Sequence, residues 1–147
     1  MLRRFSLAIA ALIVAPFLLW PLAAQATDAS IYFSPNSGEF LVGSTLDVSI
    51  VVNTGDHSIN ALQADITFPA DKLQVISPSV GTSFISIWTA QPTYSNTAGT
   101  LSFAGGLPNP GIKSSSAVLA TIQFRVKSAG NATLKFGEST QILANDG

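Results

Sequence analysis

The sequence contains no cysteine and only one histidine, His57, among its 147 residues. Without cysteine the chain can form no disulfide bond, no thiolate metal site and no thiol nucleophile. Charged residues make up only 10% of the chain, whereas hydrophobic residues make up 47%. The stability of its folded part must therefore come from an apolar core, and a chain of this length suits a single domain.

The chain also lacks an excess of basic residues. Its formal net charge is −1 at neutral pH, with seven Lys and Arg against eight Asp and Glu. Proteins that recognise nucleic acid or anionic lipid through charge carry a basic patch, and no basic cluster occurs in this sequence after Arg3-Arg4. We therefore expect no nucleic-acid partner, and contact with a membrane only through the N-terminal segment if that segment is retained.

Residues 1–26 have the three parts of a secretory signal peptide. The basic pair Arg3-Arg4 precedes an uncharged apolar stretch, residues 5–24, and the triplet Ala24-Gln25-Ala26 is a small-x-small cleavage site. An apolar stretch of about 20 residues could also remain as a transmembrane anchor, but two prolines interrupt it. We expect cleavage after Ala26 and a mature domain, residues 27–147, that is secreted or held at the cell surface. An exported domain without cysteine is more typical of bacteria or archaea than of animals.

Apolar and polar residues alternate with a period of two along most of the mature region, which is the pattern of half-buried β-strands. No window shows the 3.6-residue period of an amphipathic helix. In the last long segment we expect the even-numbered residues from Val118 to Val126 to face the core. The alternating segments are 46–52, 62–68 and 118–126, with shorter ones at 31–33, 73–76, 84–88, 101–103 and 133–136.

Turn-forming residues separate these segments. Glycine, asparagine, serine, proline and aspartate gather at 35–38, 53–56, 98–99 and 128–131. Strands at this spacing with such turns indicate an all-β domain of the sandwich or jelly-roll type. The longest irregular stretch, residues 105–116, contains two prolines and three consecutive serines, and we interpret it as a solvated surface loop.

We find no residues arranged for catalysis, metal binding or a cofactor. His57 lies in the polar turn Gly55-Asp56-His57-Ser58, and no nucleophile motif such as Gly-x-Ser-x-Gly accompanies it. Glycoside hydrolysis needs two facing carboxylates, yet the only glutamates, Glu39 and Glu138, fall near turns. Asn145-Asp146 could supply only part of the oxygen ligands that Ca²⁺ needs. We therefore expect no catalytic residue, no metal site and no cofactor.

The order of the segments resembles that of a cohesin domain, the receptor half of the cohesin–dockerin pair. The resemblance extends over nearly the whole mature chain. It begins with Pro35-Asn36-Ser37-Gly38 after the first strand, Val42-Gly43-Ser44-Thr45-Leu46-Asp47-Val48 opening the second, and Asn53-Thr54-Gly55 before the third. The matching pieces that follow are Ile59-Asn60-Ala61-Leu62-Gln63-Ala64-Asp65-Ile66-Thr67-Phe68, Ala70-Asp71-Lys72-Leu73-Gln74-Val75, Gly99-Thr100-Leu101-Ser102-Phe103, Leu119-Ala120-Thr121-Ile122-Gln123-Phe124-Arg125-Val126-Lys127 and Gly130-Asn131-Ala132-Thr133-Leu134.

This resemblance implies a jelly-roll β-sandwich of about nine strands, related to certain carbohydrate-binding modules. In cohesins the last strand follows an Asp-Gly turn and lies beside the first strand. The sequence reaches such a turn at Asp146-Gly147, so we expect the last strand to be missing and the domain over residues 27–147 to be truncated at its C-terminus. The first strand, residues 31–33, would then have an unpaired edge.

The resemblance also implies a binding face and a partner. One flat sheet face of a cohesin, including outward positions of the third strand, binds the dockerin, and the matching positions here are Ala61, Gln63 and Asp65. Many cellulosomal cohesins have Asn and Asp where this chain has Ala61 and Gln63, so we expect a dockerin-type protein partner other than a cellulosomal dockerin. The implied function is a non-catalytic interaction module in an extracellular or cell-surface assembly concerned with polysaccharide.

Two other functions remain open. A carbohydrate-binding module would stack a polysaccharide on exposed aromatic rings. Trp88 and Tyr94 are the candidates for this role if both lie exposed on one face, whereas the parity that Trp88 shares with Phe84 also fits a position in the core. The other alternative is a structural domain of a surface adhesin that has no specific ligand.

Overall fold

The computed structural model describes residues 28–145. The predicted signal peptide, its cleavage site and the Asp146-Gly147 turn lie outside the described residues. Every regular element of the described part is a β-strand, which confirms the expected all-β class. No helix there is long and apolar enough to cross a membrane.

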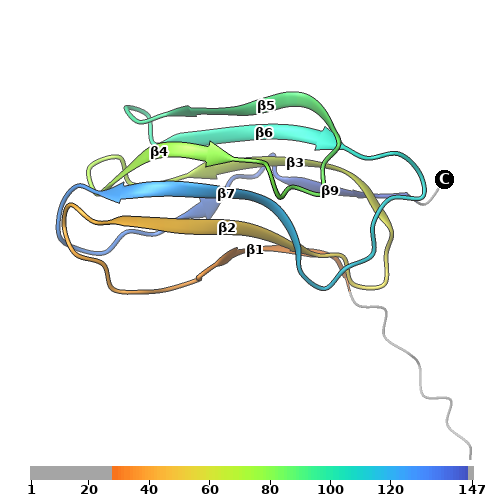
Figure 1. Ribbon diagram of the computed structural model, residues 1–147, viewed down its shortest axis with the longest axis horizontal. Helices are drawn as coiled ribbons and strands as arrows, with labels where there is room; N and C mark the ends of the chain where they lie inside the picture. Colours follow the sequence, from red (N-terminus) through yellow and green to blue (C-terminus); the bar gives the residue numbers. More distant parts are fainter. Residues whose placement is uncertain (1–27, 146–147) are drawn as a thin grey trace, which may run out of the picture.

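The strands form two antiparallel sheets that pack face to face (Figure 1). One sheet has the order β1-β2-β7-β4. In the other, β5, β6 and β3 run side by side, and the short β8 and β9 both pair with the remaining side of β3. Most neighbours in the sheets are distant in sequence, as in a jelly roll, which confirms that prediction. The described strands are β1 (Ser30–Ser34), β2 (Thr45–Asn53), β3 (Ile59–Thr67), β4 (Leu73–Ser79), β5 (Ile87–Ser95), β6 (Thr100–Gly106), β7 (Ala117–Val126), β8 (Lys135–Phe136) and β9 (Gln141–Ala144).

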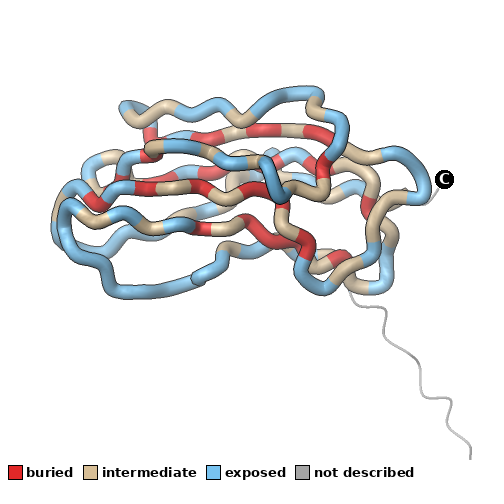
Figure 2. The backbone as a smooth tube through the Cα atoms, in the orientation of Figure 1, coloured by how far each residue is buried: buried red, intermediate tan, exposed pale blue. Residues whose placement is uncertain are grey.

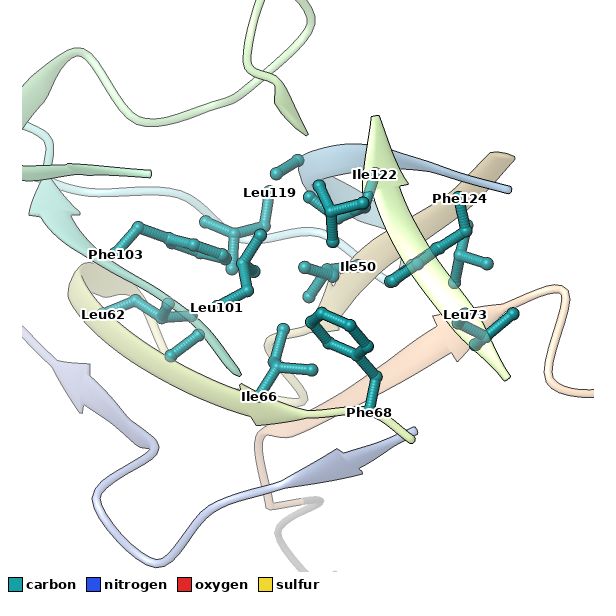
Figure 3. Packing of buried hydrophobic residues seen from close by; sticks show 14 of the residues in the cluster. Ile50, Leu62, Ile66, Phe68, Leu73, Leu101, Phe103, Leu119, Ile122 and Phe124 are labelled. Atoms are coloured by element: carbon teal, nitrogen blue, oxygen red, sulfur yellow. The ribbon is translucent and has the colours of Figure 1, made fainter. Parts of the chain in front are cut away.

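The core lies between the two sheets, where alternate residues of the long strands meet (Figures 2 and 3). Phe103 from β6 and Phe124 from β7 are among the largest fully buried side chains. Phe124 also meets Phe68 edge to face, with ring centroids 5.5 Å apart. Burying a side chain of this size contributes about 1.5–3 kcal/mol. The repetition of this pattern over β2, β3, β6 and β7 holds the sandwich together without disulfide bonds.

The alternation in β7 changes phase near the start of the strand. The expectation that Val118 faces the core is wrong, because Val118 is half-buried whereas Leu119 is fully buried. The even-numbered residues face inward only from Ala120 onward. The pairing of β7 with β2 shifts register between Ile50 and Val51, and a β-bulge of this kind re-aims the side chains around it.

Two strands of the five-stranded sheet differ from the expected segments. The expected strand 84–88 is wrong in its limits, since β5 begins at Ile87 and continues to Ser95. This strand contains Pro92 and shifts register against β6 twice, so no regular alternation marks it in the sequence. β9 pairs with β3, although residues 141–144 are too few to show a period.

The long loop between β6 and β7 is fastened to the turn after β2. Thr54, which is fully buried, donates its main-chain N–H to Ser114 O at 2.8 Å and accepts the Ser114 N–H on its hydroxyl at 3.0 Å. Ile59 and Ile112 exchange two more main-chain hydrogen bonds, both 2.9 Å long. The stretch 105–116 is thus attached to the sandwich, and its first two residues belong to β6, which corrects its interpretation as a loop that only faces solvent.

Candidate functional site

The outer face of the five-stranded sheet contains the three residues predicted to bind a partner. Ala61, Gln63 and Asp65 are alternate residues of β3, which lies between β6 on one side and β8 and β9 on the other. The residues between them, Leu62 and Ala64, are buried in the core. Because successive side chains of a strand point to opposite faces, the three candidates project outward together.

Strand pairing arranges the outward residues of this sheet in four rows. Directly paired residues of antiparallel strands share a face, so the register fixes which residues belong to each row. We call this surface the four-row face. Its rows are Ile87-Gly106-Ala61-Leu143, Ala90-Ala104-Gln63-Gln141, Thr93-Ser102-Asp65 and Ser95-Thr100-Thr67-Lys135.

The first row is an apolar strip with two raised ends. Ile87 on β5 and Leu143 on β9 are 56% and 51% exposed, and the small residues Gly106 and Ala61 lie between them. A Cβ added at Gly106 would lie 2.6 Å from Asn60 O, so no larger residue fits there without a shift of the backbone. Two exposed aliphatic side chains around a floor of small residues make a shallow trough that suits an apolar group of a partner.

The other three rows consist mainly of small hydroxyl and amide side chains. Gln63 Nε2 donates to Asp65 Oδ2 at 3.0 Å, and the hydroxyls of Thr93 and Ser102 lie 3.3 Å apart. Within the four rows Asp65 and Lys135 are the only charged residues. The four-row face is therefore low in charge and carries a single carboxylate, on its β3 strand.

Thr140 fills a break in the strand pairing beside Asp65. The Asp65 N–H donates to Thr140 Oγ1, and the Thr140 hydroxyl lies within donor distance of Asp65 O, each at 3.1 Å. Gly137 N–H also donates to Asp65 O, at 2.7 Å. The main chain beneath the candidate binding carboxylate is thus held by a side chain as well as by a neighbouring strand. Sequence reasoning missed Thr140, because its position depends on pairing between segments that are distant in the chain.

The two aromatic residues considered for carbohydrate binding do not form a platform on this face. Trp88 pairs with Gly105 and Tyr94 pairs with Leu101, and both partners are buried, so these positions belong to the inner side of β5. Trp88 is half-buried and meets Phe103 edge to face, with ring centroids 6.2 Å apart. Tyr94 is 43% exposed. This placement counts against the carbohydrate-binding alternative.

The remaining polar candidates lie apart from one another. His57 is exposed in the turn after β2, where its main-chain N–H donates to Thr54 O at 3.1 Å. Asn145 joins chain segments, since its Oδ1 accepts from Asn60 Nδ2 at 3.2 Å and its Nδ2 donates to Pro110 O at 3.4 Å. Within residues 28–145, no group of three or more His, Cys, Asp and Glu side chains is placed to hold a metal ion.

Comparison with known proteins adds a family to this geometry. A model of the cohesin domain family matches residues 34–146. Among solved structures, the chain is similar to the third cohesin ScaC of Acetivibrio cellulolyticus in complex with the ScaB dockerin, with 24% identity, 69% of this chain and 77% of that chain covered, and a TM-score of 0.57. No curated protein matches the chain.

Two further structures extend the similarity to the fold. The chain is similar to the cohesin of the OlpA–Doc918 type I cohesin–dockerin complex from Clostridium thermocellum, at 16% identity, 82% and 89% coverage and a TM-score of 0.65. It is also similar to the cohesin module of a family 33 glycoside hydrolase from Clostridium perfringens, at 13% identity, 84% and 87% coverage and a TM-score of 0.59. At these identities the structures share the sandwich fold.

Proposed function

The chain belongs to the cohesin domain family, and on this basis we propose that it is a non-catalytic module that binds a dockerin-type protein through the four-row face. Two of the similar structures are complexes of a cohesin with a dockerin, which supports a partner of this kind. The observation that carries the proposal is the four-row face itself, an outward sheet surface low in charge with two exposed aliphatic side chains.

The apolar row would supply most of the binding free energy. Ile87 and Leu143 are each about half exposed in the free chain, and removing apolar surface from water contributes roughly 25 cal/mol per Å². The small floor at Ala61 and Gly106 lets a partner group approach the sheet closely. Buried apolar anchors surrounded by polar contacts are the usual composition of a specific interface.

The carboxylate of Asp65 would fix the orientation of the partner. A carboxylate can accept about four hydrogen bonds, and Gln63 supplies one of them, so donors from a partner can be added to the same group. Ala61 offers no hydrogen-bonding group, and Gln63 has no charge. We therefore propose a dockerin-type partner that uses fewer polar contacts along β3 than a cellulosomal dockerin does.

We further propose that the module works outside the cell, in an assembly concerned with polysaccharide. The predicted signal peptide over residues 1–26 supports export, and one similar structure is a cohesin module of a glycoside hydrolase. The domain limits, residues 27–147 with a final strand still to follow, remain a prediction.

The test replaces Gln63 and Asp65 together by Ala and measures partner capture from the secretome of the producing cell. We expect capture to fall at least about tenfold, while Tm stays within a few degrees, because substitutions at exposed positions usually cost under about 0.5 kcal/mol. The matched control replaces Asp47 and Gln123, which form an equivalent amide–carboxylate hydrogen bond of 3.1 Å on the other sheet. Equal capture by the two double variants would mean that the binding site lies elsewhere.

A further inference from the structure

The two sheets have four edges, and three of them are protected against pairing with another strand. β4 contains Pro78 and shifts register between Val75 and Ser77. β5 contains Pro92 and shifts register twice. The edge formed by β8 and β9 is divided into pieces of two and four residues. Prolines, bulges and short strands are devices by which proteins prevent edge-to-edge association.

The fourth edge, β1, has none of these devices. Its five residues pair with β2 in unbroken register, and they include no proline, glycine or charged residue. Within the described residues, no strand lies on the other side of β1. Alternate N–H and C=O groups of an edge strand point away from its sheet, and these groups can pair with a further strand.

The surroundings of β1 also suit a further strand. Ile31 and Phe33 are half-buried and pack against the core, whereas Tyr32 is 40% exposed on the opposite face. A hollow of about 460 Å³ lies beside the start of β1 and is lined by both Ile31 and Ile142. A second hollow, of about 600 Å³, is lined by Phe33. A neighbouring strand would therefore bury more of Ile31 and Phe33.

We propose that two copies of this chain associate through β1, side by side and antiparallel, about a two-fold axis at Tyr32. The strand sequence Ser-Ile-Tyr-Phe-Ser has the same pattern in both directions, so Ser30 lies opposite Ser34 of the other copy and Ile31 lies opposite Phe33. Apolar side chains then meet on the inner face, and a shift of one residue would reverse this arrangement. The two four-stranded sheets become one continuous sheet with a closed, self-complementary contact.

This association goes beyond the proposed partner binding, because β1 lies in the other sheet from the four-row face. A dimer presents two four-row faces and would bind a multivalent partner more tightly than one copy does. A stable dimer buries on the order of 1,000 Å² or more, and a pair of five-residue strands is a small contact. We therefore expect an equilibrium that depends on protein concentration rather than an obligate dimer.

Sedimentation velocity of the exported chain over a range of concentrations measures this equilibrium. We expect a dimer whose fraction rises with concentration. The variant Tyr32→Lys places two like charges opposite each other at the axis and should weaken association at least tenfold. Its circular dichroism should remain that of a β-sandwich, since the position is exposed. The matched control Gln74→Lys adds the same charge to the outward side of β4 and should leave association unchanged.

A mixture of two variants tests the register. Tyr32→Lys and Tyr32→Asp should each be monomeric alone and should form a mixed dimer together, because opposite charges then meet at the axis. The proposal is overturned by a monomer at every concentration, by equal weakening in Gln74→Lys, or by a mixture that fails to associate. It is also overturned if a version of the chain that continues past Gly147 is monomeric because the added residues pair with β1 in the same molecule.

Discussion

Asn96 and Val75 are joined by two hydrogen bonds that imitate a strand pair. Val75 N–H donates to Asn96 Oδ1 at 2.7 Å, and Asn96 Nδ2 donates to Val75 O at 2.9 Å. Asn96 lies in the turn between β5 and β6, whereas Val75 lies in β4 of the other sheet. One side chain therefore connects the two sheets next to the edges formed by β4 and β5.

Replacing Asn96 by Ala should lower the free energy of unfolding by about 1–3 kcal/mol, because both main-chain groups of Val75 would lose a partner in a buried position. Urea denaturation measures the change. The control Gln74→Ala alters the exposed neighbour of Val75 and should stay within about 0.5 kcal/mol of the unchanged chain. Identical unfolding midpoints for Asn96→Ala and the unchanged chain would show that water takes over the role of the amide.

The contact between Thr54 and Ser114 gives a second prediction. Thr54→Val keeps the shape of the side chain but removes the hydroxyl that accepts the Ser114 N–H. Because Thr54 is fully buried, we expect a loss of about 1–3 kcal/mol in unfolding free energy and faster hydrogen exchange at the Ser114 amide. Thr54→Ser retains the hydroxyl and should restore slow exchange. Slow exchange in Thr54→Val would contradict this account of how the loop is held.

The apolar row of the four-row face gives a third prediction. Leu143→Ser should weaken partner capture by about tenfold, since an exposed aliphatic anchor loses its contact, while Tm changes little. The control is the same substitution at Leu41, which is 82% exposed in the segment between β1 and β2. Binding assays with the captured partner compare the two variants. If Leu41→Ser weakens binding and Leu143→Ser does not, the apolar contact belongs to that segment.

A fourth prediction concerns processing of the chain. The secreted form should begin at Thr27, because Ala24-Gln25-Ala26 is the small-x-small site that follows the apolar stretch. N-terminal sequencing or mass spectrometry of the protein from the culture medium reads this residue directly. A chain that retains Met1 and is recovered in the membrane fraction would show a retained anchor instead.

The central strands could be predicted from the sequence because one of their faces lies in the core. In β3, Leu62, Ala64 and Ile66 alternate with polar or small residues, so the pattern alone places Ala61, Gln63 and Asp65 together on the outward face. The structure has the same arrangement. Strict alternation is a local property, and no information about neighbouring strands is needed to recognise it.

The remaining parts of the face depend on pairings that no single strand reveals. Ile87 joins the apolar row only because β5 shifts register against β6 around Ala90. Leu143 joins it because a strand of four residues pairs with the start of β3. The burial of Leu119 in place of Val118 has the same origin, a bulge that arises between two strands distant in sequence.

The interleaving of core and surface residues along β3 constrains how related chains can diverge. Substitutions at Ala61, Gln63 or Asp65 can change what the face recognises while the alternate residues keep the fold. Insertion of one residue before this strand would exchange the two sets, so that Leu62 would face solvent and Gln63 would enter the core. New specificities can therefore arise through point substitutions here, whereas a change in the length of this segment would be eliminated by selection.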